Sequence, residues 1–275
     1  MGLEVTREIW TLTGETSSLR TDALAVEEPL EIRVNSSAIT TTMRTPGHDL
    51  ELTLGWLFAE GIIVSLDDLI GLEHDSNEEN VVQVQLRDGL ESGFEPRHYS
   101  SGSACGVCGK TSLDQIHARG MKPITNSAQV TARVLYDLPN ALRKVQTTFD
   151  STGGLHAAAL FTLSGELLGM REDVGRHNAL DKLVGFSRLE GLPLEHSIML
   201  VSGRVGFEIA QKCVAANVPI LAAVGAPSSL ALDLALEFNL TLIGFLRGER
   251  ANVYSGSERV SGIPARGSVS GAKPL

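Results

Sequence analysis

The chain has 275 residues, a length that predicts one large domain or two modest ones with room for a buried core. Hydrophobic residues make up 43% of it, no apolar run reaches membrane-spanning length, and residues 1–16 lack the apolar core of a signal peptide. We therefore expect a cytoplasmic protein. The net charge of −10 argues against a general nucleic-acid-binding surface, although a local arginine cluster could still hold phosphates.

The first part of the chain predicts a small α+β domain over residues 1–125. Residues 30–34 alternate apolar and charged side chains, as a half-buried strand does, and residues 35–37 turn the chain into a return strand over 38–43. A helix opens at 46–49 and stops at Gly61. We expect a second short helix over 67–72 and another strand over 82–86.

The second part, residues 126–275, predicts an α/β domain. A helix begins at Ser127, is interrupted by Pro139 and resumes over 141–145. Residues 155–161 predict a buried strand, 167–170 its hairpin partner and 176–186 an amphipathic helix. Strands over 197–202, 218–224 and 240–245 then alternate with helices over 207–216 and 228–238. This βαβαβ order predicts a mostly parallel sheet with helices on both faces, followed by a loosely ordered Gly/Ser-rich tail from Ser255.

A C-x-x-C pair, Cys105 and Cys108, lies in a loop of glycine and serine between Tyr99 and Gly109. The glycines disfavour a regular element, and the small neighbours leave both sulfur atoms accessible to a reaction partner. Three cysteines do not make a disulfide framework, and a reducing compartment would keep the pair available for chemistry. We expect this loop to be mobile.

Three chemistries compete for the pair. A structural zinc site needs two further ligands, whereas only Cys213 remains and no second C-x-x-C exists, so we expect no metal. A thioredoxin-like dithiol should follow a buried strand, and none precedes the loop. A sulfur carrier would hold a persulfide on one cysteine while the other tunes or resolves it. Spacing alone does not separate the last two interpretations.

The predicted parallel sheet places three polar loops at the carboxyl ends of its strands, where ligands of such sheets collect. Their glycines permit close backbone approach, Ser228 or Ser229 caps a helix N-terminus that favours an anion, and their arginines can bind phosphate. Each loop alone is typical of an ordinary turn, but three on one rim favour a phosphate-bearing ligand. The loops are Ser202-Gly203-Arg204, residues 225–229 and Arg247-Gly248-Glu249-Arg250.

A second polar cluster spans Asp173 to Asn178 at the start of a predicted helix. Asp173 could simply satisfy backbone donors as a cap. Alternatively, the segment is a polar wall of the cleft in which His177 exchanges a proton. His156, in an apolar strand, is more typical of a core histidine, and Cys213 is typical of a buried small hydrophobe.

Four segments together closely resemble the FdhD family, the accessory sulfurtransferases of formate dehydrogenases. They are residues 103–109, 152–159, 171–182 and 202–204. The resemblance implies a cytidine-deaminase-like C-terminal domain, a smaller N-terminal domain and a homodimer. It also implies that sulfur passes from a cysteine desulfurase to the molybdenum cofactor, in its bis-guanine-dinucleotide form, before insertion into formate dehydrogenase. The cofactor is then a bound substrate, with no permanently bound cofactor implied.

Position by position, the resemblance makes Cys105 the persulfide carrier and Cys108 its partner. It associates Phe245, Leu246, Arg247, Gly248, Glu249 and Arg250 with the guanine dinucleotide, and we add Ser202, Gly203, Arg204 and His177 as candidate contacts. We further expect the cysteine loop to reach the rim beside residues 173–178. Deaminase chemistry is not expected, because the only C-x-x-C lacks both a preceding proline and an upstream H-x-E. A cofactor-binding chaperone and a thiol redox protein remain as alternatives.

Overall fold

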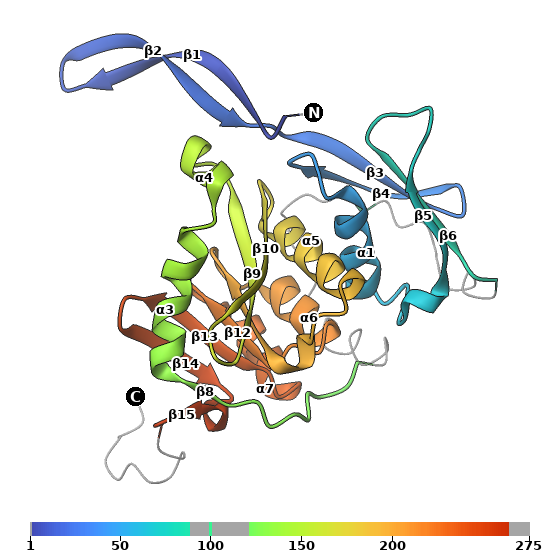
Figure 1. The fold of residues 1–275 in the computed structure, drawn as a ribbon, viewed down its shortest axis with the longest axis vertical. Helices are drawn as coiled ribbons and strands as arrows, with labels where there is room; N and C mark the ends of the chain where they lie inside the picture. The colour runs from blue at the N-terminus through green and yellow to red at the C-terminus, as the bar shows by residue number, and fades with distance from the viewer. Residues whose placement is uncertain (1, 89–98, 101–120, 264–275) are drawn as a thin grey trace. The chain divides into compact units, whose positions relative to one another are not determined.

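The computed structural model describes residues 2–88, 99, 100 and 121–263 (Figure 1). These residues fall into two compact units that interleave along the chain. Unit 1 comprises Met1–Cys108, Lys144–Ala158 and Met170–Leu192; unit 2 comprises Gly109–Arg143, Ala159–Gly169 and Pro193–Leu275. The predicted domains are parts of the chain that fold separately, and the compact units do not test that property. The division into two domains after residue 125 therefore stays a prediction.

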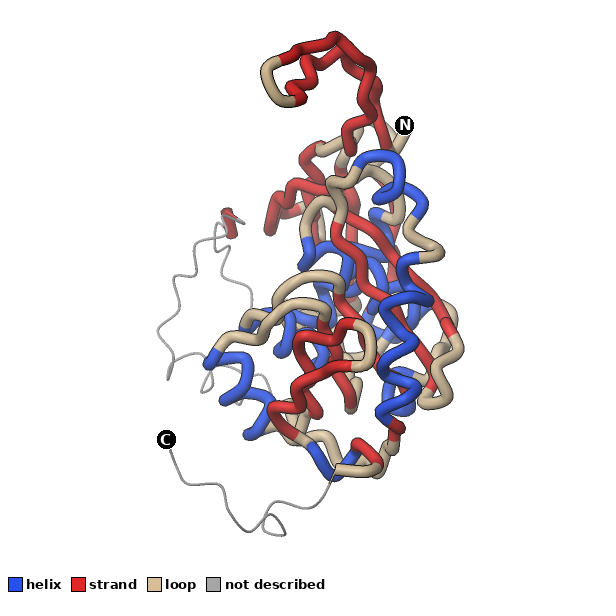
Figure 2. Tube along the Cα trace, turned by 90° about the vertical axis from the view of Figure 1, so that its left-hand side faces the viewer, coloured by secondary structure: helices blue, strands red, loops and turns tan. Residues whose placement is uncertain are grey.

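Unit 1 begins with a long antiparallel hairpin that the sequence pattern does not predict. Strand β1 (Glu4–Thr13) pairs along its full length with β2 (Thr16–Ala25). Gly14, with φ of 59°, supplies the left-handed backbone of the two-residue turn. Charged and apolar residues are mixed on both faces, so no clean alternation marks these strands. The hairpin stands apart from the other strands of its unit (Figure 2).

A five-stranded sheet forms the centre of unit 1, in the order β5-β6-β3-β4-β7. The strands predicted over 30–34, 38–43 and 82–86 are confirmed. The five strands are β3 (Glu28–Val34), β4 (Ser37–Arg44), β5 (Leu69–His74), β6 (Val81–Leu86) and β7 (Tyr99–Ser100). Asn35 and Ser36, both with positive φ, make the turn between β3 and β4.

The short helix predicted over 67–72 is wrong. Only a 3-10 turn, η1 (Leu66–Asp68), forms there, and the chain then enters β5. The polar residues that suggested a helix start instead close a capping box between Ser65 and Asp68. Residues 69–74 gain more from pairing with β6 than from extending one turn of helix.

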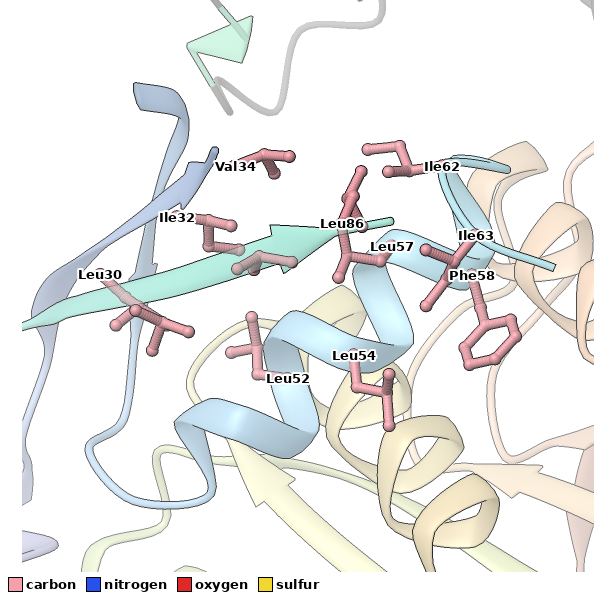
Figure 3. Packing of buried hydrophobic residues seen from close by; sticks show 12 residues of the cluster. Leu30, Ile32, Val34, Leu52, Leu54, Leu57, Phe58, Ile62, Ile63 and Leu86 are labelled. Carbon is pink, nitrogen blue, oxygen red and sulfur yellow. The ribbon is translucent and has the colours of Figure 1, made fainter. Parts of the chain in front are cut away.

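The core of unit 1 lies between this sheet and helix α1 (Asp49–Ala59), and the helix predicted to open at 46–49 is confirmed. Leu30, Ile32 and Val34 of β3 point towards Leu52 and Leu57 of the helix (Figure 3). On another side α1 crosses helix α5 (Arg176–Leu189), which confirms the amphipathic helix predicted from residue 176. A short helix, α4 (Thr147–Thr152), packs beside β2.

Unit 2 is built on a six-stranded sheet in the order β10-β9-β11-β12-β13-β14. Its strands are β9 (His156–Thr162), β10 (Leu167–Asp173), β11 (Ser197–Val201), β12 (Ile220–Ala223), β13 (Thr241–Arg247) and β14 (Arg250–Ser255). Strands β11, β12 and β13 are parallel, and β14 returns antiparallel at the edge. Strands β9 and β10 each run from one unit into the other.

Helices α6 (Phe207–Ala215) and α7 (Ser229–Glu237) connect the parallel strands of unit 2, which confirms the predicted βαβαβ order. They lie on one side of the sheet, and α3 (Ala132–Arg143) lies on the other (Figure 1). All residues of β11 and β12 are buried, as expected for parallel strands covered on both faces. The chain therefore has a mixed α/β fold.

The helix predicted from Ser127 with a break at Pro139 is wrong in two respects. Residues 130 and 131 form strand β8 (Val130–Thr131), which pairs with β15 (Val260–Ser261), so α3 starts only at Ala132. The helix then continues through Pro139. Proline removes one backbone hydrogen bond, and the burial of Leu135, Leu138 and Leu142 on the same helix offsets that loss.

The loosely ordered tail predicted from Ser255 is also wrong as far as residue 263. A 3-10 turn, η4 (Ser257–Arg259), buries Arg259, whose side chain is 4% exposed. Its guanidinium donates to the carbonyl oxygens of Asn239 and Asn126, at 2.9 and 3.3 Å. The Arg259 guanidinium, with several donors on one rigid group, thus fixes a segment whose composition suggested a loosely ordered tail. Another 3-10 turn, η3 (Leu194–His196), leads into β11.

Candidate functional site

The loops that follow β11 and β12 meet each other and the carboxyl end of β13 at one edge of the unit 2 sheet, the edge at which the sequence predicts three polar loops. The backbone N–H of Gly225 donates to the carbonyl of Gly203 at 3.2 Å, and that of Phe245 donates to the carbonyl of Gly225 at 3.0 Å. A Cβ on Gly225 would lie 2.7 Å from the same Gly203 oxygen. Glycine is thus required at residue 225 for the loops to approach, and we call this edge the strand-end rim.

Three arginines extend from the strand-end rim. Arg204 follows β11, while Arg247 and Arg250 face each other across the turn between β13 and β14. All three are exposed, and no ion pair with another described residue engages them. Guanidinium groups left without a counter-ion are suited to bind phosphate in bidentate fashion.

Phe245 has an unusual backbone for its residue type. Its φ is 53°, in the left-handed region, and its side chain is 42% exposed at an irregularity in the β13–β14 ladder. A non-glycine residue in that region costs on the order of 1–2 kcal/mol, and such strain tends to collect at binding sites. The strand-end rim therefore presents an aromatic ring on the same hairpin as Arg247 and Arg250.

The N-terminus of α7 also lies at the strand-end rim. Ser228 is its N-cap, and its hydroxyl accepts a hydrogen bond from the N–H of Ala231 at 3.2 Å. The backbone N–H of Ser228 in turn donates to the carbonyl of Val205 at 2.9 Å. Of the two serines that could cap this helix, Ser228 does so, and Ser229 begins the helix.

The polar cluster predicted over residues 173–178 forms a buried network in unit 1 that we call the Asp173 network. The Asp173 carboxylate is fully buried and lies 2.7 Å from the ammonium of Lys182. It also accepts hydrogen bonds from the backbone N–H groups of Thr45 and Gly175, at 3.1 and 2.8 Å. Burial raises the pKa of Asp173, and the nearby Lys182 charge opposes that rise.

Lys182 and Asn178 extend the Asp173 network to the connection between β4 and α1. The Lys182 ammonium donates to the carbonyl of Thr45 at 2.7 Å. The Asn178 amide donates to the carbonyl of Met43 at 2.7 Å. Asp173 therefore satisfies backbone donors, as predicted for a capping residue. The N-cap position of α5 is nevertheless Gly175, and no side chain caps this helix.

Only some residues of the polar wall predicted over 173–178 are accessible to solvent. Asp173 and Asn178 are buried, whereas Arg176 and His177 in the first turn of α5 are half-buried. His156, also half-buried, has its pKa lowered by burial and by the positive charge of Arg176. His156 therefore favours the neutral imidazole, which can accept as well as donate a proton.

The structure brings together the unit 2 candidates but not all of the predicted site. Ser202, Gly203, Arg204 and the segment from Phe245 to Arg250 share the strand-end rim, whereas His177 belongs to unit 1. Cys105 and Cys108 lie outside the described residues. Cys213 is fully buried, and burial raises the pKa of its thiol, which confirms its structural interpretation.

Lys182 and Thr45 are polar participants that sequence reasoning misses. Lys182 is an isolated cation on the buried face of a helix, one turn after Asn178, and that position is the signal that could have revealed it. Among the described residues, no three His, Cys, Asp or Glu side chains gather closely enough to hold a metal ion. None of the helices described here is long and apolar enough to cross a membrane.

Similar proteins agree on a family. A model of the FdhD/NarQ family matches residues 25–261. The chain is 51% identical over 257 residues to the sulfur carrier protein FdhD of Streptomyces coelicolor, covering 89% of this chain and 91% of that protein. It is 45% identical over 240 residues to the sulfur carrier protein FdhD of Sulfolobus acidocaldarius, covering 87% and 91%.

The fold is similar to a crystal structure described as a formate dehydrogenase accessory protein from Desulfotalea psychrophila. The TM-score is 0.77, and the match covers 94% of this chain and all of that one. Sequence identity between the two is 23%, so this likeness concerns the fold alone.

Proposed function

The chain belongs to the FdhD/NarQ family, and from that membership we propose that it is a sulfurtransferase that serves a formate dehydrogenase. The observation that carries the proposal is an identity of about half over nine-tenths of the length of a sulfur carrier protein. The substrate is the molybdenum cofactor in its bis-guanine-dinucleotide form, which the protein sulfurates before insertion into the dehydrogenase.

Cys105 carries the sulfur as a persulfide. The Cys105 thiolate attacks the terminal sulfur of a persulfide on a cysteine desulfurase, so that a new S–S bond forms and the desulfurase cysteine leaves as a thiolate. No external oxidant or reductant is consumed. Cys108 is close enough in sequence to tune the reactivity of Cys105 or to resolve it. Transfer to the cofactor depends on the access that the glycine- and serine-rich sequence around both cysteines favours.

The strand-end rim holds the guanine dinucleotide end of the cofactor. Support comes from the three exposed arginines, which form no ion pair with another described residue, from the close backbone approach at Gly225 and from the exposed ring of Phe245. A pyrophosphate is a dianionic group that bidentate guanidinium contacts neutralise, and an aromatic ring can stack on a purine base. Ser202, Gly203, Gly248 and Glu249 complete this surface, whereas Leu246, expected among the contacts, is fully buried and points into the core of unit 2 instead.

His177, half-buried in the first turn of α5, is a further contact in this proposal. The C-terminal domain is proposed to be cytidine-deaminase-like in fold, a view that its mixed sheet with helices on both faces supports. The protein is proposed to act as a cytoplasmic homodimer. The cysteine loop is proposed to reach the strand-end rim and to become protected when cofactor binds. Its first two residues form strand β7 rather than loop, and residues 101–109 lie outside the described residues.

Mass spectrometry of the intact protein tests the sulfur-transfer role. After incubation with a cysteine desulfurase and cysteine, the protein should gain one sulfur atom, which a reducing agent removes. Cys105→Ser should abolish the gain, whereas Cys213→Ser, which alters a buried thiol, should keep it. A chaperone that only shields the cofactor gains no sulfur, and a thiol redox protein loses two hydrogens instead. Either outcome would refute the carrier role.

A further inference from the structure

Strand β5 forms one edge of the five-stranded sheet in unit 1. It pairs with β6 on one side, and no strand among the described residues pairs with it on the other. The free N–H and C=O groups of such an edge are a template for another strand, and proteins usually protect them. The groups that β5 leaves free, and the side chains around them, therefore indicate what this edge can bind.

The backbone groups of Leu72 and His74 point away from β6. Just beyond the strand, the N–H of Asp75 donates to the carbonyl of the residue opposite it, Val81, at 2.9 Å. In an antiparallel ladder, residues that bond across in this way alternate with residues whose backbone groups point outward. Leu72 and His74 lie an odd number of residues before Asp75 in an unbroken register, so they belong to the second set. Each offers one donor and one acceptor to a further strand.

Apolar side chains are exposed along the same part of the chain. Ile70 of β5 is 59% exposed, and in the segment that leads into the strand Val64 is 82% and Leu66 39% exposed. Leu69 and Leu72 are only partly buried where they pack against the core of unit 1. An apolar side chain on an added strand would remove some of this surface from water, which is a favourable change.

A pocket of about 280 Å³ lies at the His74 end of β5. Its wall includes the guanidinium of Arg44, which both carboxylate oxygens of Asp49 accept from, at 2.8 and 2.9 Å. The carboxylate of Glu28 lies 3.3 Å from the same guanidinium. Glu79, also in the wall, is exposed and bonds to no other described residue. Carboxylates therefore outnumber the one guanidinium, and the pocket favours a cation.

The sequence around this edge is negatively charged. No lysine or arginine occurs between Arg44 and Arg87, whereas carboxylates recur throughout, including Glu73 on β5 itself and Asp67 just before it. Because no metal-binding group of side chains occurs among the described residues, the cation is an organic one. A second copy of the chain does not fit, since pairing two β5 edges would gather the same carboxylates at one place.

We propose that the β5 edge binds an extended, positively charged segment of a partner protein by strand addition. The segment bonds to the outward backbone groups of Leu72 and His74. Side chains two residues apart lie on the same face of a strand. An apolar residue beside Leu72 therefore places a lysine or arginine, two residues away, beside His74 and in the pocket. The residue between them faces Glu73 and is a second cation. This surface belongs to unit 1 alone and does not depend on the sulfur-transfer role.

Fluorescence polarisation with the full-length protein tests the proposal. The probe is a labelled peptide, Thr-Lys-Lys-Val-Lys-Lys-Thr, whose central valine lets it fit in either strand direction. It should bind saturably with a dissociation constant below about 1 mM. The same peptide with glutamate in place of every lysine should not bind. Absence of binding by the basic peptide, or equal binding of both peptides, would overturn the proposal.

Two substitutions of His74 separate backbone pairing from side-chain contact. Proline removes the outward N–H and is tolerated on the free side of an edge strand. His74→Pro should therefore weaken binding about five- to tenfold. His74→Ala keeps the N–H and should bind within about twofold of the natural protein. Equal losses in the two variants, or an unchanged affinity of His74→Pro, would rule out strand addition.

Glu79→Lys tests the pocket and stays informative if proline disturbs the fold of the edge. Reversing this charge should weaken binding of the basic peptide about five- to tenfold. Glu8→Lys is the matched control, because it reverses an exposed carboxylate on the separate β1–β2 hairpin and changes the net charge equally. It should leave the affinity within about twofold. Equal weakening by both variants would mean general attraction to an acidic protein, and the proposed site would be wrong.

Discussion

Gly55 of α1 and Gly185 of α5 are the points at which these two helices touch. A Cβ added to Gly55 would overlap the carbonyl of Asp181, and one added to Gly185 would overlap the carbonyl of Glu51. Each glycine therefore lies directly on the backbone of the other helix. This close approach packs α5 against α1, the helix that covers the unit 1 sheet. The Asp173 network lies at the start of α5.

Replacing either glycine at this crossing should destabilise the fold strongly. Gly185→Ala or Gly55→Ala forces the helix backbones apart, and we expect a loss of about 3–4 kcal/mol in the free energy of unfolding. Urea denaturation measures it. Gly71→Ala is the control, because its new Cβ would make only ordinary contact with Gln85 at 3.7 Å. Equal stability of Gly185→Ala and Gly71→Ala would show that the helices separate more easily than the packing indicates.

The buried pair of Asp173 and Lys182 should show strong energetic coupling. Asp173→Asn leaves the Lys182 ammonium, 1% exposed, without a counter-ion and should cost about 3–5 kcal/mol. Lys182→Met leaves the carboxylate alone and should also be severe. The double variant removes both charges and should cost less than the two single changes together by about 2 kcal/mol or more. If the two single losses in the free energy of unfolding simply added up in the double variant, Asp173 and Lys182 would not be energetically coupled.

The exposed pair of Arg33 and Glu78 provides the comparison for this cycle. Its atoms lie 2.7 Å apart, the same distance as in the buried pair, but the Glu78 side chain is 54% exposed. Water and salt screen such a pair, so the same cycle should give no measurable coupling. The contrast separates the effect of burial from that of distance.

Glu51 should make stability depend on acid. Burial acts to raise its pKa, but hydrogen bonds from Arg171 and His48 outweigh burial and hold it at about 2. The folded pKa lies below the ordinary value of 4.5, so the contribution is complete above pH 4.5 and is lost as the pH falls towards 2. Glu51→Gln should cost about 2 kcal/mol at pH 7 and progressively less below pH 4.5.

Unfolding by urea between pH 3 and 7 provides the measurement for Glu51. The quantity to follow is the difference between the natural protein and Glu51→Gln, because other carboxylates also titrate in this range. Glu73→Gln, which changes an exposed position on β5, is the matched control. A Glu51→Gln difference that stays constant down to pH 3 would mean that the contact with Arg171 acts by packing on Phe186 rather than by charge.

The sequence predicts best where a periodic pattern and burial agree. Strands β11 and β12 are continuous apolar runs between turn residues, so their type, order and parallel pairing could be foreseen. Prediction fails where distant residues decide. Pro139 stays in a helix because that helix packs on the sheet, and Arg259 orders a polar tail through carbonyls more than a hundred residues away. Local propensity contains neither contact.

For the site, the sequence predicts which residue types gather there, but it does not predict which residues bond to each other. The glycines and arginines of the strand-end rim follow strands, so their meeting is a consequence of parallel topology. The bond from Phe245 to Gly225, and the left-handed backbone that accompanies it, need three-dimensional coordinates. Likewise Asp173 has a capping pattern in sequence, yet its main partner is Lys182, in the second turn of α5.

The strand-end rim should bind guanine nucleotide through its arginines. Guanosine diphosphate is a fragment of the proposed substrate, and calorimetry should detect its binding. Arg250→Ala or Arg204→Ala removes one charged contact and should weaken binding by about 1.5–3 kcal/mol, which is roughly ten- to a hundredfold in affinity. Arg250→Lys keeps the charge but loses the bidentate geometry, so it should recover only part of the loss.

Arg133→Ala is the matched control for nucleotide binding. It removes an exposed arginine from α3, which lies on the face of the unit 2 sheet opposite α6 and α7. It should leave the affinity for guanosine diphosphate unchanged. If all three alanine variants bound equally well, the nucleotide would not contact the strand-end rim. The sulfur gain on Cys105 could still occur in that case, because accepting sulfur from the desulfurase does not require the nucleotide. The two measurements therefore test the two halves of the proposed function separately.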